Sequence, residues 1–514
     1  MKARLDKFLI YSAYFYITLP FIIFLLGWIR WYYSIPFCIV ILISLFFSFK
    51  EYRNSFVEIN LKKHYKKLIA VACLILLWAG FSGIGGYSYQ TWDHHFRNAI
   101  FRDLITYDWP VIYHVDGFET GHPLQGQTCI MAYYIGFWLP SALIGKLFGW
   151  QAGNLFLYLW TITGLILIFY FICRLFRSFS TTLLIVFIFW GTAYVIGLFV
   201  KYPVKTLIKS EAVLWAGNMF YADNNTGLLY WVFNQSITPW LIIILTLNQM
   251  PKKNIFFVYS LCFFQAPLAF IGFFPFVMYI ALKNYFMKQD RFIPAIKQLL
   301  SFQNTAGSCI IFVISYLFFS SNSAAEHFTL VPRNIFFYLA FIFLSFGFIA
   351  FLIYRKYKNE PLFYISIFVL LPLPFFQLGF GLDFCARVSI PPMFILMLLA
   401  MRYLREEPGN AKKNLVIAYL IVSGIMPSLQ IFRSITLTGF QYISKLNFDV
   451  SYLSRQHNPF VNKIRTKLSE AKDHNLLIKD DFKTLSSAAN HSIRNFMGPV
   501  DKSFFYRNIA KTSN

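Results

Sequence analysis

Long apolar runs recur along most of this 514-residue chain, and they constrain the fold more than any short motif does. About 20 consecutive apolar residues are enough to cross the hydrocarbon core of a bilayer as a helix. The composition agrees, because 58% of the residues are hydrophobic and 13% are charged. The mean hydropathy of +0.55 lies outside the range of most soluble chains. The sequence therefore predicts an all-α, polytopic transmembrane helical bundle.

The apolar runs predict about thirteen transmembrane helices. They are expected at residues 8–28, 33–49, 68–87, 153–173, 181–200, 229–249, 254–266, 268–283, 307–320, 335–354, 361–380, 389–405 and 413–433. The stretch around Pro267 must be split by a tight turn, because proline interrupts a helix. We expect three regions: 1–67 with two helices and a basic loop, 68–433 as the main membrane domain, and 434–514 as a small extracytoplasmic tail.

The basic residues predict the orientation of the chain. The formal net charge is +24, and much of the excess lies in short loops beside apolar runs, where Lys and Arg keep loops cytoplasmic. Topology therefore explains the charge better than nucleic-acid binding does. With a cytoplasmic N-terminus, the later basic loops fall on the same side if the run 131–149 dips in or lies at the interface without crossing. The stretches 88–152 and 201–228 and the tail then share the outer face of what we expect to be a bacterial inner membrane.

The outer stretch 88–152 carries the densest group of ionisable residues in the chain. Such residues are costly near a bilayer, so a functional role is the first hypothesis for them. Residues 92–105 have the periodicity of an amphipathic helix whose apolar side carries Phe96, Ala99, Ile100 and Leu104. Asp93 and Arg97 are then one turn apart, so the guanidinium can hold and orient the carboxylate. The alternative is a structural ion pair that anchors an interfacial helix.

The order of residues in this stretch resembles the first outer loop of GT-C class glycosyltransferases. The matching parts are Asp93 with Phe96 and Arg97, Trp109-Pro110, His122-Pro123-Leu124, and Leu147-Phe148-Gly149. The resemblance implies a GT-C-like bundle whose long first outer loop contains juxtamembrane helices. It also implies an enzyme, like the protein mannosyltransferases and aminoarabinose transferases, that takes a sugar from a polyprenyl-phosphate carrier. In that class the acidic residue at the position of Asp93 is the catalytic one, so the resemblance implies this role for Asp93. Two helices precede the loop here, and a His-Pro replaces the common Pro-Pro.

Further candidate residues lie outside the Asp93 helix. By the same resemblance, Asp223 is a second catalytic acid, although Asp-Asn-Asn is also a good turn sequence. Asp383 and Arg387 are again one turn apart, and a cation there suits a lipid phosphate, unless the pair only ends a helix. The remaining expected substrate contacts are His94, Arg102 and His122. His94 and His95 point to different helix faces, which argues against joint metal binding. A divalent cation is left open, and the absence of a nucleotide-binding motif argues against a nucleotide cofactor.

These residues predict an extracytoplasmic membrane glycosyltransferase of cell-envelope synthesis or modification. Its partners would be a polyprenyl-phosphate or diphosphate sugar donor, a glycan or lipid acceptor, and membrane lipids, with no nucleic acid. A transporter or flippase for a lipid-linked saccharide is the main alternative, but transporters place charges at broken helices near the midplane. An envelope polysaccharide polymerase or ligase and an inactive assembly scaffold are further alternatives that the sequence leaves open.

Overall fold

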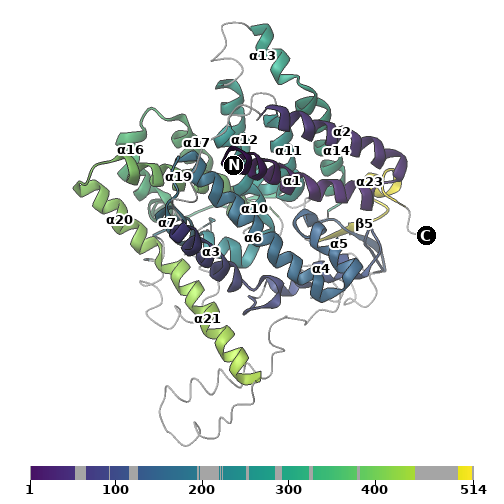
Figure 1. Cartoon of the computed structure of the whole chain (residues 1–514), viewed down its shortest axis with the longest axis horizontal. Helices are drawn as coiled ribbons and strands as arrows, with labels where there is room; N and C mark the ends of the chain where they lie inside the picture. The colour runs from purple at the N-terminus through teal and green to yellow at the C-terminus, as the bar shows by residue number, and fades with distance from the viewer. Residues whose placement is uncertain are drawn as a thin grey trace, which may run out of the picture.

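The computed structural model of the chain is dominated by helices (Figure 1). It describes residues 2–51, 65–91, 93–114, 126–193, 196, 219, 221–222, 224–249, 254–283, 292–322, 328–378, 383–445 and 496–511. Within these ranges, seven helical segments are long and apolar enough to cross a membrane: Leu5–Trp28, Trp31–Lys50, Trp150–Leu175, Asn225–Asn248, Ile335–Tyr357, Asp383–Glu406 and Ala411–Tyr442. The chain is an all-α, helical membrane protein.

The long helices follow the predicted apolar runs. They are α1 (Lys2–Trp28), α2 (Trp31–Glu51), α3 (Tyr65–Gly80), α6 (Trp150–Leu175), α10 (Asn225–Gln249), α19 (Ile390–Glu406), α20 (Ala411–Ser423) and α21 (Ile425–Lys445). Two more are interrupted by a wider turn: η6 (Gln303–Gly307) with α14 (Ser308–Phe319), and α15 (Ile335–Ile342) with η8 (Phe343–Gly347) and α16 (Phe348–Tyr357). Large apolar side chains such as Phe336 and Phe351 point outward from these helices. Such a surface is suited to lipid.

Three predicted helices are shorter than expected, and the first is the run 68–87, where α3 ends at Gly80. Within the described residues, the run 181–200 gives α7 (Thr181–Phe189), and the run 361–380 gives α17 (Pro361–Leu370), η9 (Leu373–Phe375) and the strand β4 (Phe376–Leu378). Residues 194–195, 197–200 and 379–380 lie outside the described part of the chain. In the run 361–380 the α-helix ends just before Pro372, because proline lacks the backbone donor that a continuing helix needs. A further short helix, α13 (Phe292–Leu299), has no counterpart in the prediction.

Helices α11 (Ile255–Gln265) and α12 (Pro267–Leu282) form a hairpin whose tip lies inside the bundle. The break falls at Ala266, as predicted from Pro267. Near the tip, the Gln265 amide donates to the carbonyl of Ile17 over 2.9 Å, and Ile17 is in the middle of α1. With a rise of 1.5 Å per residue, α11 is about 16 Å long, roughly half the thickness of a hydrocarbon core. The hairpin therefore reaches the interior from one end of the bundle.

The run 131–149, which the orientation argument predicts not to cross, lies within the described residues and contains no helix long enough to span a membrane. It forms η4 (Ile135–Trp138) and α5 (Leu139–Phe148). Gly136 packs against the hairpin tip, where an added Cβ would lie 2.8 Å from the Gln265 side chain. At the other end, Gly145 packs against Ile105 of α4 (His94–Thr106). Because Tyr133, just before η4, also contacts Arg97 of α4, both ends of the segment meet the same helix. That the run does not cross the membrane stays a prediction.

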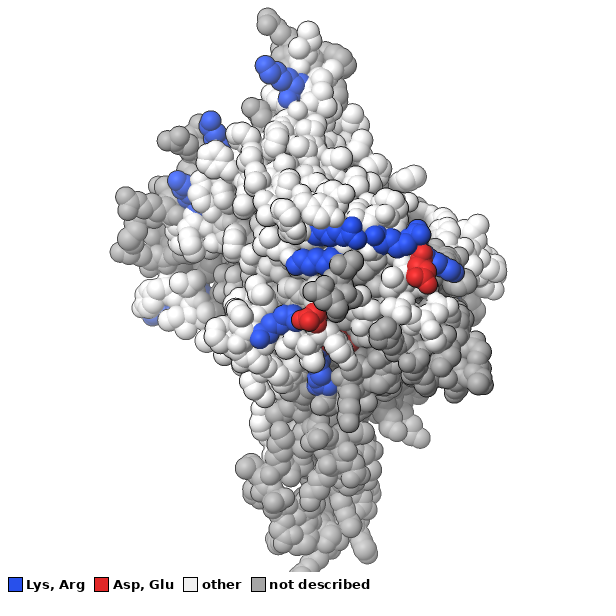
Figure 2. All heavy atoms as spheres, turned by 90° about the vertical axis from the view of Figure 1, so that its right-hand side faces the viewer, with Lys and Arg blue, Asp and Glu red and all other residues white. Residues whose placement is uncertain are grey.

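The end of the chain is part of the outer loop's structure. Strands β1 (Ile112–His114), β2 (Thr128–Met131) and β5 (Met497–Pro499) form an antiparallel sheet in the order β1-β2-β5. After β5, α23 (Phe504–Asn508) leads to Ala510, whose carbonyl accepts a 2.9 Å hydrogen bond from Arg30 at the end of α1. The boundary predicted at residue 434 falls inside α21. Figure 2 looks onto this side, where Lys and Arg gather in a row across a largely uncharged surface.

The helix ends form two groups, one at each end of the bundle, as their contacts show. One group joins the end of α1, the start of α6, the helices α4 and α23, and a short helix α18 (Asp383–Val388) that follows β4, the strand paired with β3 (Phe328–Leu330). The other joins the ends of α6, α10, α12 and α19 with the start of α17. The first end also contains the 3-10 turn η3 (Ile84–Gly86). That the first end faces outward stays a prediction from the basic loops.

Candidate functional site

Helix α4 presents the ionisable groups of the outer loop. It spans His94–Thr106 with Asp93 at its N-cap, close to the predicted 92–105. The side chains of Ala99, Ile100 and Leu104 are buried as the periodicity predicts. Because this apolar side packs against α5 and α6, the polar side of α4 is held in a fixed direction.

Asp93 and Arg97 form the ion pair that their spacing predicts. The Nη2 of Arg97 lies 2.8 Å from Oδ2 of Asp93. The arginine side chain is 7% exposed and the carboxylate 34% exposed. The charge of Asp93 is therefore held by a buried cation while the carboxylate stays accessible from outside.

A break in α10 explains why Arg97 is buried. Val232 has non-helical angles (φ −142°, ψ 40°) inside that helix, and such a break releases backbone carbonyls that need a donor. The carbonyl of Trp231 accepts a 2.5 Å hydrogen bond from Nε of Arg97. The Nη1 atom donates to Oδ1 of Asn234 over 3.0 Å. Each guanidinium nitrogen thus has a protein acceptor, and Arg97 positions Asp93 against α10.

Two tyrosines lie beside this pair. The rings of Tyr133 and Tyr134 have centroids 3.8 Å apart. Burial raises the pKa of the Tyr133 hydroxyl, an effect that Arg97 partly offsets, and burial also raises the pKa of Tyr134. Burial lowers the pKa of Arg97, but Asp93 and the tyrosine hydroxyls more than offset this and raise it. At neutral pH the site therefore combines neutral hydroxyls with a charged guanidinium.

Asp383 and Arg387 form a second pair next to the same tyrosines. The Nη2 of Arg387 lies 3.0 Å from Oδ1 of Asp383, with side-chain exposures of 9% and 54%. The charges of both residues act on the pKa values of Tyr133 and Tyr134. The fold thus brings together two i, i+4 pairs that are far apart in sequence. The Nε of Arg387 is buried and finds no hydrogen-bond partner among the described residues.

A close approach of two helices places the second pair. Gly272 of α12 lies against the end of α18, where an added Cβ would be 1.9 Å from the carbonyl oxygen of Val388. Only a residue without a Cβ allows this separation, so the packing of α12 fixes the position of α18. Arg387 is part of α18, so the same packing also fixes the position of Arg387.

Other predicted contacts have different surroundings. His94 is buried, and its Nδ1 lies 3.0 Å from the Thr91 hydroxyl. The guanidinium of Arg102 lies over the Trp150 ring at the start of α6, 5.0 Å from its centroid. Both side chains therefore make packing contacts within the loop. His122, Asp223 and the side chain of His95 are outside the described residues.

Sequence reasoning missed three parts of this region. Asp103, which the sequence analysis does not single out, is buried and accepts a 2.6 Å hydrogen bond from the Tyr113 hydroxyl. The role of Tyr133 and Tyr134 was not predicted, although two adjacent tyrosines in a polar outer loop were a usable signal. Phe496, whose ring centroid lies 4.7 Å from that of Tyr133 in a tilted arrangement, comes from the far end of the chain, and no local pattern predicts this contact.

The described residues include no group of three His, Cys, Asp or Glu side chains placed to hold a metal ion. No protein-family model matches the chain, and neither a curated protein nor a solved structure matches it. Fold and site together define the class as a helical membrane protein with two acid–base pairs at one end of its bundle.

Proposed function

We propose that this protein is a GT-C-like membrane glycosyltransferase. It transfers a sugar from a polyprenyl-phosphate or polyprenyl-diphosphate donor to a glycan or lipid acceptor on the outer face. The observation that carries the proposal is the meeting of the Asp93–Arg97 and Asp383–Arg387 pairs around Tyr133 and Tyr134. Such a transfer needs a positioned carboxylate for the acceptor and a cation for the departing phosphate.

Asp93 is the catalytic carboxylate of the proposal. A hydroxyl nucleophile on the acceptor donates its hydrogen bond to the carboxylate, which accepts the proton as the new glycosidic bond forms. The 34% exposure of Asp93 supports this assignment, because an acceptor can approach it. Arg97 keeps the carboxylate ionised and oriented, and its contacts with Trp231 and Asn234 favour positioning over direct contact with phosphate.

Arg387 is the phosphate contact of the proposal. Its Nη2 is oriented by Asp383, while its Nε has no acceptor among the described residues. An arginine oriented in this way suits the oxygens of a phosphate, since a guanidinium offers donors in a fixed fork. As the bond between sugar and phosphate breaks, the electron pair stays on the phosphate oxygen, where the cation stabilises it.

The test is transfer of labelled sugar from a polyprenyl donor by the purified protein in detergent. Asp93→Asn keeps an oxygen for Arg97 but removes the charge and the basicity. We expect a loss of about 10²- to 10⁴-fold in rate. Asp108→Asn is the matched control, because Asp108 is exposed beyond the end of α4, and it should retain transfer.

Full transfer by Asp93→Asn, with melting and yield like those of the native protein, would exclude Asp93 as the catalytic group. The transporter alternative makes the opposite prediction. In proteoliposomes it would move the lipid-linked saccharide between leaflets without forming a product, and Asp93→Asn would alter the translocation rate alone.

A further inference from the structure

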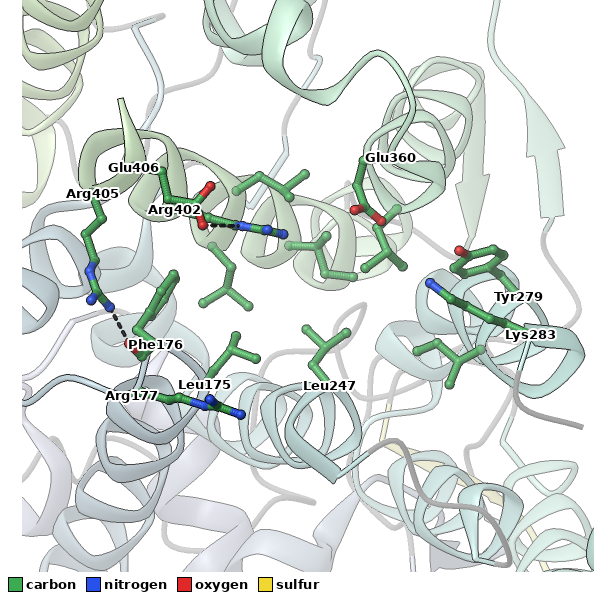
Figure 3. A pocket seen from close by; sticks show the side chains of 15 residues that line it. Leu175, Phe176, Arg177, Leu247, Tyr279, Lys283, Glu360, Arg402, Arg405 and Glu406 are labelled. Atoms are coloured by element: carbon green, nitrogen blue, oxygen red, sulfur yellow. Dashed lines mark hydrogen bonds and ion pairs between the residues drawn. The ribbon is translucent and has the colours of Figure 1, made fainter. Parts of the chain in front are cut away.

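The end of the bundle opposite α4 contains a cavity of about 740 Å³. It lies between the ends of α6, α10, α12 and α19 and the start of α17 (Figure 3). Its floor is apolar, with Leu175, Leu247, Ile395, Leu398 and Leu399 among the lining residues. This volume lies within the range of cavities that hold organic ligands, and it is far larger than a phosphate ion requires.

Basic side chains dominate the polar part of the lining. They are Arg177, Lys283, Arg402 and Arg405, against the carboxylates of Glu360 and Glu406. Arg402 is paired with Glu406 over 2.8 Å, and Glu406 also lies 3.3 Å from Lys356. The charge of Glu406 is therefore already shared by two cations. Among the described lining residues, the other three cations face one remaining carboxylate, Glu360.

The charges are separated across the cavity. In Figure 3, Arg177 and Arg405 lie on one side, while Glu360 and Lys283 lie on the other, with leucine side chains between them. Arg405 is held there, because it donates to the carbonyl of Phe176 and its guanidinium lies 5.7 Å from the centroid of that ring. A ligand that fits this arrangement has an anionic group at one end and a hydrogen-bond donor toward Glu360.

The backbone at Arg177 is unusual for a side chain of this size. Its φ of 48° is in the left-handed region, where glycine is the residue that most often ends a helix. Residues held in such conformations cluster at functional sites. Here the conformation ends α6 and leaves the guanidinium in the lining of the cavity.

The cations also lie at the depth of lipid headgroups. Each follows or ends an apolar helix: Arg177 comes after α6, Lys283 after α12, and Arg402 and Arg405 are in the last turns of α19. The ends of membrane helices are at the interface, where basic side chains meet lipid phosphates. The apolar floor then continues into the depth where acyl chains lie.

We propose that this cavity binds the phosphodiester headgroup of a membrane glycerophospholipid that carries a hydrogen-bond donor. The phosphate lies between Arg177 and Arg405, and the hydroxyl or ammonium group donates to Glu360. The first parts of the acyl chains cover the leucines of the floor. The site is at the opposite end of the bundle from Asp93, and the inference does not rest on the proposed function.

The experiment is native mass spectrometry of the full-length protein in mild detergent with phosphatidylglycerol, phosphatidylethanolamine or phosphatidylcholine of identical acyl chains. We expect the first two lipids to be retained and phosphatidylcholine, whose headgroup has no donor, to be retained less. Arg177→Gln/Arg405→Gln, which removes both proposed phosphate contacts, should bind the retained lipids about tenfold more weakly. Arg355→Gln is the matched control, since Arg355 is an exposed arginine on α16 at the same end, outside the cavity lining.

Three results would overturn the proposal. Unchanged lipid retention by the double variant would show that the cavity does not bind the headgroup. Equal retention of phosphatidylcholine would exclude the donor contact with Glu360. Displacement of the lipid by millimolar inorganic phosphate would indicate a free-anion site. If the double variant melts lower than the native protein, Arg177→Gln alone is measured, and loss of the lipid-dependent rise in melting temperature supports the proposal while its persistence contradicts it.

Discussion

Arg97 at the α4 end of the bundle and Arg177 at the opposite end are held in different ways. At the α4 end, Arg97 is buried and each of its nitrogens has a protein acceptor. At the opposite end, Arg177 is exposed, and the cations outnumber the carboxylates around the cavity. A buried cation with fixed partners holds those partners in a defined geometry. Removing the cation leaves the partner groups buried without a donor, which lowers the stability of the protein strongly. Exposed cations that outnumber the nearby carboxylates cost the fold little stability, and they remain available to a ligand.

Replacing Arg97 should give the largest difference between the two ends. Arg97→Met leaves the Asp93 carboxylate, the Trp231 carbonyl and the Asn234 amide without their donor. We expect the free energy of unfolding to fall by about 3 to 5 kcal/mol. Arg177→Met, at the exposed position, should change it by about 0.5 kcal/mol or less. Thermal unfolding of both variants in the same detergent measures the difference, and equal melting temperatures would contradict the contrast between the ends.

A single methyl group should distinguish the packing at the two ends. Gly272→Ala places a Cβ against the Val388 carbonyl, so α18 must move and the protein should lose about 2 to 3 kcal/mol of stability. Gly409→Ala adds the same methyl group near the other end, where nothing lies within 4 Å.

The control variant Gly409→Ala should therefore melt like the native protein. In the transfer assay, Gly272→Ala should also raise the KM for the polyprenyl donor, because Arg387 moves with α18. A native KM together with a native melting temperature would show that the close approach at Gly272 does not set the position of Arg387.

The buried tyrosine of the outer loop should give a smaller effect that depends on pH. Burial and the neighbouring Asp103 raise the pKa of Tyr113 well above its ordinary value of 10.0. Its contribution to stability is therefore complete below pH 10 and is lost as the pH rises above that value. Tyr113→Phe should cost about 1 to 2 kcal/mol at neutral pH, since Asp103 loses a donor, and should decline less steeply at alkaline pH.

The measurement is the melting temperature in detergent between pH 8 and 11. Tyr442→Phe is the control, because Tyr442 is exposed on α21, and it should follow the native curve. A Tyr113→Phe curve parallel to the native one would mean that another group governs the alkaline loss of stability.

The sequence determined the features that depend on neighbours along the chain. Apolar runs gave the membrane class and most helix positions, since a span needs a fixed length of apolar residues. Periodicity gave the buried side of α4, and the i, i+4 spacing gave both acid–base pairs. The split at Ala266 followed from Pro267. Helix ends were less predictable, because α7 and α17 stop where tertiary contacts or prolines intervene.

The tertiary structure decided everything that joins distant segments. It placed the Asp93 and Asp383 pairs around Tyr133 and Tyr134, and it brought Phe496 and β5 back to the outer loop. Arg97 donates to a carbonyl beside the break at Val232, and the local sequence does not predict that break. One cavity is lined by Arg177, Lys283, Glu360 and Arg405 only because the ends of four helices meet the start of a fifth. Contacts of this kind depend on how whole helices pack, and the spacing of residues along one helix does not encode them.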